Sequence, residues 1–154
     1  MTNIKSEESE VTEVVYNACF GGFSVSDAAV RRYAEIKGIT LWVEKGNHDW
    51  FNTYWTVPPE QRIGVLKSEA WHKATDRERQ ISNDLYTKHT IDNRSFSRTD
   101  PVLVQVVKEL GDAANGACAE LAIADILAGE KYRIDEYDGR ESVMTADDYQ
   151  WETA

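Results

Sequence analysis

The sequence has few cysteines: only Cys19 and Cys118 among 154 residues. A small scaffold held together by disulfides is therefore excluded. Two free, buried thiols are the default interpretation, and a disulfide or a nucleophile is the less common alternative. A chain of this length can bury a hydrophobic core without disulfides or metal, so one folded domain is expected.

Basic residues are also scarce. Seventeen Lys and Arg stand against 27 Asp and Glu, which gives a formal charge of −10, and no local cluster of basic residues offsets it. Nucleic-acid phosphates would repel such a chain, so no direct nucleic-acid partner is expected. The acids gather towards both ends, where they either keep the protein in solution or form a face that docks on a basic partner. They are Glu7, Glu8, Glu10 and Glu13, and then Asp135, Glu136, Asp138, Glu141, Asp147, Asp148 and Glu152.

Long apolar runs are missing. No segment approaches the ~20 residues needed to cross a bilayer, and the first residues lack the basic start and apolar stretch of a signal peptide. We therefore expect no membrane partner and a place in the cytoplasm where the chain is made. The hydrophobic content of 42%, with five Trp and seven Tyr, favours a folded protein over a disordered one.

Catalytic and metal-binding patterns are absent as well. His48, His72 and His89 do not pair with a cysteine or a second histidine at metal-ligand spacing, and neither cysteine lies in a known nucleophile signature. Asp135 and Glu136 would point to opposite faces of a strand, which argues against a pair of catalytic acids. The sequence therefore predicts no catalytic residue, no metal site and no cofactor.

Local patterns predict an α+β fold: a largely antiparallel sheet with two main helices packed on one face and a surface helical excursion. Residues 1–10 form a flexible N-terminus, 11–145 a single domain with its excursion at 62–94, and 146–154 a tail. Asp138-Gly139 is a favoured hairpin dipeptide and makes the last three strands a meander. The expected strands are 11–19, 39–43, 51–57, 117–127, 131–137 and 140–144, and the expected helices are 27–37, 76–88 and 100–116.

The helix that begins at Pro101 is the clearest of these elements. Pro101 suits the first helical position, Asp100 can cap the free amides, and Asn115-Gly116 is a good stop. Its apolar stripes predict burial on more than one side; they are Leu103, Val107, Leu110 and Ala114, with Val102, Val106 and Ala113 beside them. Ser24 with Asp27, or alternatively Ser26, would cap the helix at 27–37. Thr75 and Glu78 could form a capping box for the helix at 76–88.

Arg98 is the most informative charge, because it lies just before a helix N-terminus. There a guanidinium and free amides can hold a phosphate; the alternative is a salt bridge to a nearby carboxylate. The Gly21-Gly22 turn likewise offers either amides to an anion or a tight turn that needs positive φ. Aromatic residues concentrated in the first half would form core and subunit interface or stack on a base; they are Trp42, Trp50, Tyr54, Trp55 and Trp71.

Three segments carry a family resemblance: 17–26 (NACFGGFSVS), 98–104 (RTDPVLV) and 134–139 (IDEYDG). Together with 54–60 (YWTVPPE) and 114–116 (ANG), they resemble a family of small proteins encoded by tailed bacteriophages and prophages. The resemblance runs from about Val14 to Val143. It departs at the tail, where the family often has a basic-aromatic segment and this chain has Asp148-Tyr149-Gln150-Trp151.

The resemblance implies interference with host defence in the bacterial cytoplasm. One form is a homo-oligomeric sponge that sequesters a cyclic or ADP-ribose-derived nucleotide messenger, similar to the anti-Thoeris and anti-CBASS sponges. A second is an acidic inhibitor or DNA mimic that binds a host defence protein, and a third is an enzyme acting on a nucleotide. For the sponge, the expected ligand-binding residues are Arg98, Thr99, Asn115, Gly21, Gly22, Phe23 and Ser24.

Overall fold

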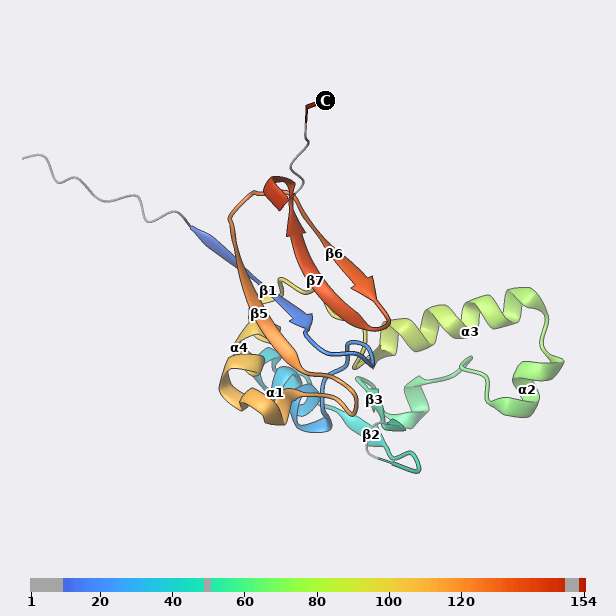
Figure 1. Ribbon diagram of the computed structural model, residues 1–154. Helices are drawn as coiled ribbons and strands as arrows, with labels where there is room; N and C mark the ends of the chain where they lie inside the picture. Colours follow the sequence, from blue (N-terminus) through green and yellow to red (C-terminus); the bar gives the residue numbers. More distant parts are fainter. Residues whose placement is uncertain (1–9, 49–50, 149–152) are drawn as a thin grey trace, which may run out of the picture.

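The computed structural model describes residues 10–48, 51–148 and 153–154. The predicted N-terminal segment 1–10, except Glu10, lies outside this range, as do Trp50 and residues 149–152 of the predicted tail. The predicted α+β class is confirmed: the described residues form four α-helices and seven strands, all paired antiparallel (Figure 1).

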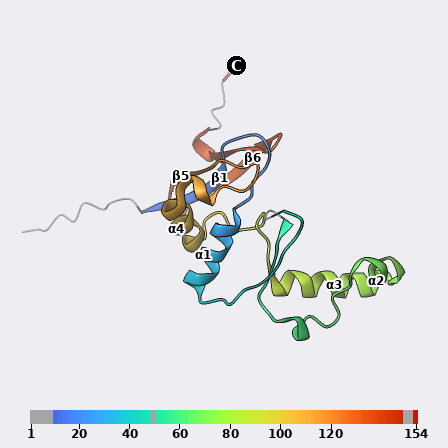
Figure 2. The same cartoon turned by 90° about the horizontal axis from the view of Figure 1, so that it is seen from below.

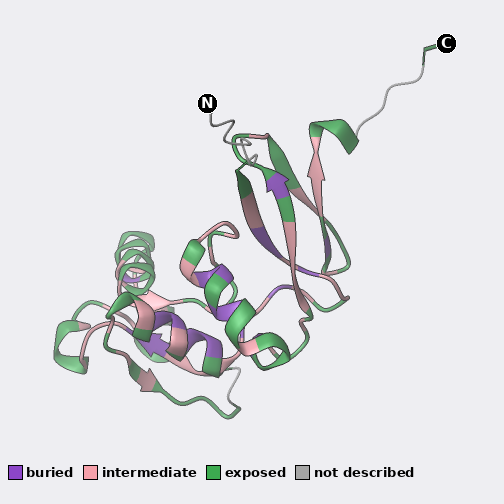
Figure 3. Cartoon of the chain, turned by 90° about the vertical axis from the view of Figure 1, so that its left-hand side faces the viewer, coloured by how far each residue is buried: buried purple, intermediate pink, exposed green. Residues whose placement is uncertain are grey.

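Two helices form the centre of the molecule. Helix α1 (Asp27–Lys37) packs against α4 (Pro101–Leu110), and α4 also contacts strand β1 (Val11–Asn17). Their facing sides are the most buried part of the chain (Figure 3). Phe23 and Tyr54 add aromatic rings to this core, whose aliphatic members include Val15, Val25, Ala29, Val30, Leu103, Val104, Val106, Val107 and Ala114.

Local capping explains where these helices begin and end. Ser26, rather than Ser24, caps α1 by accepting a hydrogen bond of 3.1 Å from the Ala29 amide. The Asp100 cap is confirmed, since its carboxylate accepts from the Val102 amide at 2.9 Å. Helix α4 stops at Leu110, earlier than predicted, because Gly111 takes a non-helical backbone (φ 55°, ψ −129°). The chain continues as a 3₁₀ turn, η3 (Gly111–Ala114).

The strands form three small sheets rather than one. Strand β1 pairs with β5 (Leu121–Leu127), while β6 (Tyr132–Tyr137) pairs with β7 (Arg140–Thr145) around the predicted Asp138-Gly139 turn. Both turn residues have positive φ, 50° and 84°, as this hairpin requires. The expected meander is wrong in one pairing: β5 bonds to β1, a long-range partner that local spacing cannot reveal. The third sheet comprises β2 (Trp42–Glu44), β3 (Thr53–Trp55) and β4 (Thr90–Ile91).

An arm projects from this core (Figures 1 and 2). After the short turn η2 (Pro59–Gln61) it consists of α2 (Ser68–Lys73) and α3 (Asp76–His89), and β4 returns the chain to β3. The Thr75–Glu78 capping box of α3 is confirmed. Arg79 lies over the Trp71 ring at 5.6 Å and bonds to the Trp71 carbonyl at 2.9 Å, which joins α2 to α3. None of the helices described is long and apolar enough to span a bilayer.

Candidate functional site

The predicted salt bridge of Arg98 is present. Its guanidinium donates two hydrogen bonds to the Glu141 carboxylate, at 2.6 and 2.9 Å. The two side chains are only 17% and 9% exposed. The guanidinium also lies over the face of Phe23, 3.5 Å from the ring centroid. The charge of Arg98 is therefore neutralised and covered. Of the two interpretations of this residue, the structure shows the salt bridge to a carboxylate.

Asn17, which is fully buried, extends this ion pair into a network. Its backbone amide donates to Glu141 at 2.8 Å, and its side-chain amide donates to the carbonyls of Cys19 and Gly139 at 2.7 and 2.8 Å. Its Oδ1 accepts from the Glu120 amide at 2.8 Å. We refer to Asn17, Phe23, Arg98, Gly139 and Glu141 as the clasp. It brings together residues from all three sequence segments of the resemblance or from their immediate neighbourhood.

Glycines let the clasp close. The β6–β7 turn rests on the Gly21-Gly22 loop, with the Gly21 amide 3.4 Å from the Asp138 carbonyl. A Cβ on Gly139 would overlap the backbone of that loop, and a Cβ on Gly21 would come within 2.6 Å of the Cys118 carbonyl. Gly21 and Gly22 have φ values of 122° and 93°. The tight-turn interpretation therefore accounts for the conformation of both residues.

Two of the predicted ligand-binding residues, Thr99 and Asn115, belong neither to the clasp nor to the wall of the cavity beside it. The Thr99 hydroxyl is 3.5 Å from that of Ser97. The Asn115 side chain accepts from the Leu121 amide at 2.9 Å, and its backbone forms a bridge with Val25. Asn115 thus fixes the start of β5 against the loop that precedes α1.

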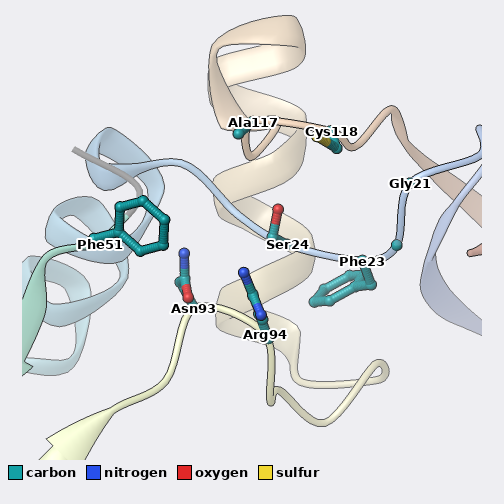
Figure 4. A pocket seen from close by; sticks show the side chains of 9 residues that line it. Gly21, Phe23, Ser24, Phe51, Asn93, Arg94, Ala117 and Cys118 are labelled. Carbon is teal, nitrogen blue, oxygen red and sulfur yellow. The ribbon is translucent and has the colours of Figure 1, made fainter. Parts of the chain in front are cut away.

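A cavity of about 550 Å³ lies beside the clasp. Four of the seven predicted ligand-binding residues line it: Gly21, Gly22, Phe23 and Ser24. The other residues in its wall were not predicted; they are Phe51, Asn93, Arg94, Ala117 and Cys118. Figure 4 shows Asn93 and Arg94 on one side, Ala117 and Cys118 on the opposite side and Ser24 between them. We call it the loop cavity, because each of these residues lies outside the α-helices and strands.

Arg94 provides the positive charge of the loop cavity. The side chain is exposed, and within the described ranges nothing forms an ion pair or hydrogen bond with its guanidinium. A turn holds its backbone in place: the Asp92 carboxylate accepts from the Arg94 amide at 2.9 Å. The side-chain amide of the neighbouring Asn93 donates a long hydrogen bond, of 3.4 Å, to the Val25 carbonyl. Sequence patterns missed Arg94 because it lies in an irregular segment; the one available signal was the Asp-Asn turn before it.

Several pKa shifts lie outside the loop cavity, around the capping carboxylates of the two central helices. Burial raises the pKa of Tyr33 to about 12, and its hydrogen bond to Asp100 adds to the effect. Burial likewise raises the pKa of Tyr54, whose hydroxyl bonds to Asp27 at 2.9 Å. Burial alone would raise the pKa of Asp27, but hydrogen bonds from Arg31, Tyr54 and Asn52 outweigh it and lower the value. These phenol–carboxylate pairs stabilise the helix starts.

The loop cavity therefore combines a fixed glycine backbone, two aromatic rings and one available cation. In the described part of the chain, no group of three or more His, Cys, Asp or Glu side chains is arranged to hold a metal ion. Comparisons with known proteins add no relative: no family model, no curated protein and no solved structure matches this chain.

Proposed function

We propose that this chain is a phage-encoded counter-defence protein that sequesters a nucleotide-derived immune signal in the bacterial cytoplasm without converting it. The signal would be a cyclic or an ADP-ribose-derived nucleotide. One observation carries the proposal: the loop cavity places the Arg94 guanidinium, which has no partner among the described residues, in one wall with two phenylalanines and an open glycine backbone. The resemblance to phage proteins supports the biological setting.

Each part of the cavity suits one part of a nucleotide. The Arg94 guanidinium can hold a phosphate through two parallel hydrogen bonds. Phe51 already contacts the His48 ring, with centroids 6.1 Å apart, but it is 57% exposed and can also stack on a base. The backbone at Gly22 allows close approach, because a Cβ placed there would meet nothing within 4 Å. The volume of about 550 Å³ lies inside the range of roughly 300–1,000 Å³ of small-molecule sites.

The proposal reassigns the arginine that contacts phosphate. Arg98 is committed to Glu141, so its part is to hold one face of Phe23. Arg94 takes the phosphate instead. We also propose that the sponge is a homo-oligomer, for which the exposed Ile63 and Ile81 of the arm are candidate interface residues.

A thermal-shift panel of ADP-ribose, cyclic ADP-ribose and cyclic dinucleotides tests the proposal. We expect one of them to raise the melting temperature and to be recovered intact after heat denaturation. Arg94→Gln should weaken its binding about ten- to hundredfold, the cost of one charged hydrogen-bonding partner. Arg77→Gln is the matched control, because Arg77 is an exposed arginine on α3, away from the loop cavity.

Other outcomes would replace the proposal. A chemically altered nucleotide would identify an enzyme. No shift with any nucleotide, together with salt-sensitive association with a defence protein, would favour the acidic inhibitor. Equal binding by Arg94→Gln and the wild type would remove the loop cavity as the site.

A further inference from the structure

A second and larger cavity, of about 760 Å³, lies where the C-terminal ends of α1 and α3 approach the segment 95–97. Its wall carries five serine and threonine hydroxyls from different parts of the chain, of which that of Thr90 already donates to the Tyr86 carbonyl at 2.6 Å. These hydroxyls belong to Thr56, Thr87, Thr90, Ser95 and Ser97. We call this cavity the hydroxyl cleft.

Two ammonium groups are available at the hydroxyl cleft. Lys37 ends α1 and Lys88 lies in the last turn of α3; both are exposed, and neither forms an ion pair within the described ranges. Lys37 lies 5.4 Å from the centroid of the Tyr33 ring. The wall also holds the carboxylates of Asp92 and Asp100, so in this acidic chain the two lysines balance the negative charge of the cleft and can turn to an anionic group.

The carboxylates of the cleft already have partners. Asp100 accepts from the Tyr33 hydroxyl at 2.5 Å and from the Val102 amide at 2.9 Å. Asp92 accepts from the Arg94 amide at 2.9 Å through one oxygen, which leaves the other oxygen for a donor on a ligand. Asp100 keeps its negative charge, and the nearby Lys37 helps to lower its pKa. Lys88 has no ion-pair partner among the described residues, and one Asp92 oxygen remains for a ligand hydroxyl.

Aromatic rings complete the cleft. Tyr33 and Phe96 pack edge to face with centroids 5.0 Å apart, and Tyr86 packs against Trp55 at 5.5 Å. An apolar ring surface flanked by hydroxyls and one carboxylate oxygen matches a sugar, which has both C–H faces and hydroxyl groups. Residues 92–97 separate the two sites: Asn93 and Arg94 line the loop cavity, whereas Asp92, Ser95, Phe96 and Ser97 line the hydroxyl cleft.

We propose that the hydroxyl cleft binds a phosphorylated sugar, with its phosphate held by Lys37 and Lys88 and its hydroxyls held by the serine and threonine side chains. This site is separate from the loop cavity and does not depend on the function proposed for it. The chemistry requires both parts of the ligand, the phosphate and the sugar.

Isothermal titration with ribose 5-phosphate, ribose and inorganic phosphate tests the inference on the full chain. We expect ribose 5-phosphate to bind at least about tenfold more tightly than either ribose or phosphate. Lys37→Gln and Lys88→Gln should each weaken it about five- to tenfold. Lys73→Gln, on the exposed arm, is the matched control and should bind as the wild type does.

Arg94→Gln distinguishes the two sites: a loss of ribose 5-phosphate binding in this variant would place the sugar phosphate in the loop cavity and overturn the inference. Equal affinity for phosphate and ribose 5-phosphate would overturn the inference, since it would remove the contribution of the sugar. So would an equal loss in Lys73→Gln, which would indicate non-specific attraction. Amide NMR spectra of each lysine variant would verify that it remains folded.

Discussion

Arg94 and Arg98 lie four residues apart in the chain and in opposite environments. Arg98 lies mostly covered in the clasp, with both ends of its guanidinium bonded to Glu141. Arg94 lines the loop cavity, exposed and without a partner among the described residues. A satisfied, buried arginine contributes to the fold, whereas an unsatisfied one beside a cavity is available to a ligand. We therefore expect substitutions of Arg98 to affect mainly stability and substitutions of Arg94 to affect mainly ligand binding.

Phe23 connects these two regions. The Arg98 guanidinium covers the ring at 3.5 Å, and the same residue forms part of the cavity wall. Its side chain is almost fully buried. Disruption of the clasp should therefore also disturb the cavity, whereas changes at Arg94 should not reach the clasp.

The largest effect is expected from Arg98→Met. It leaves the Glu141 carboxylate buried and without its counter-charge, which should reduce the free energy of unfolding by about 3–5 kcal/mol. Urea denaturation followed by tryptophan fluorescence measures this loss. In the double variant Arg98→Met/Glu141→Gln, the neutral amide can still accept from Asn17, so most of the stability should return. A double variant no more stable than Arg98→Met would show that charge burial is not the cause.

Gly139→Ala should have the next largest effect. Gly139 has a φ of 84°, and a Cβ there would overlap the Gly21-Gly22 backbone. We expect a loss of about 2–4 kcal/mol, from the strained conformation together with the overlap with the loop, measured by the same denaturation. Gly129→Ala is the control, because Gly129 also has positive φ but a Cβ there would meet nothing within 4 Å. Equal losses in both variants would mean that backbone strain alone, and not the contact with the loop, sets the cost.

Several features of the fold, some of them around Arg98, could be predicted from local sequence. The caps of α3 and α4, the Asp138-Gly139 hairpin and both interpretations of Arg98 follow from short-range patterns. The carboxylate that pairs with Arg98 could not be predicted, since Glu141 is 43 residues away and looks like any acid in an acid-rich segment. The β1–β5 pairing was missed for the same reason: long-range partners leave no local pattern.

The residues that line the loop cavity were harder to predict from the sequence. The Gly21–Ser24 stretch was expected to bind a ligand and does line the loop cavity, but Phe51, Asn93 and Arg94 come from loops without periodicity. Their convergence depends on where β3 and β4 bring the chain back to the core. Only the three-dimensional arrangement reveals that Arg94, rather than Arg98, is the cation at the cavity.

Asp100→Asn offers a smaller test at the start of α4. Burial alone would raise the pKa of Asp100, but the Tyr33 hydroxyl and the Val102 amide outweigh it and lower the value from 3.8. A lowered folded-state pKa adds stability above the unfolded pKa, and this stability is lost as the pH falls through the folded value. Asparagine still caps the helix, so the variant should lose only the charge contribution, about 0.5–1 kcal/mol at pH 7.

Thermal unfolding between pH 7 and pH 2 measures the effect. The stability difference between wild type and Asp100→Asn should begin to shrink below about pH 4, the pKa of an unfolded-state aspartate, and disappear once the pH lies below the lowered pKa of the folded carboxyl. Asp27 stays intact in both proteins, so its own lowered pKa cancels in the comparison. A difference that stays constant across this pH range would assign the effect to shape and not to charge.

The smallest effect on stability is expected from Arg94→Gln, within about 0.5 kcal/mol of the wild type, because the exposed Arg94 side chain has no partner among the residues that the structure describes. The same variant should show the largest specific loss of nucleotide binding. Arg98→Met should show the reverse order: a large loss of stability, and a binding loss that follows from the displaced Phe23 ring. Denaturation and ligand titration on both variants at one temperature measure all four quantities. If Arg94→Gln destabilised the fold as much as Arg98→Met, the guanidinium of Arg94 would be part of the scaffold, and the separation between clasp and cavity would fail.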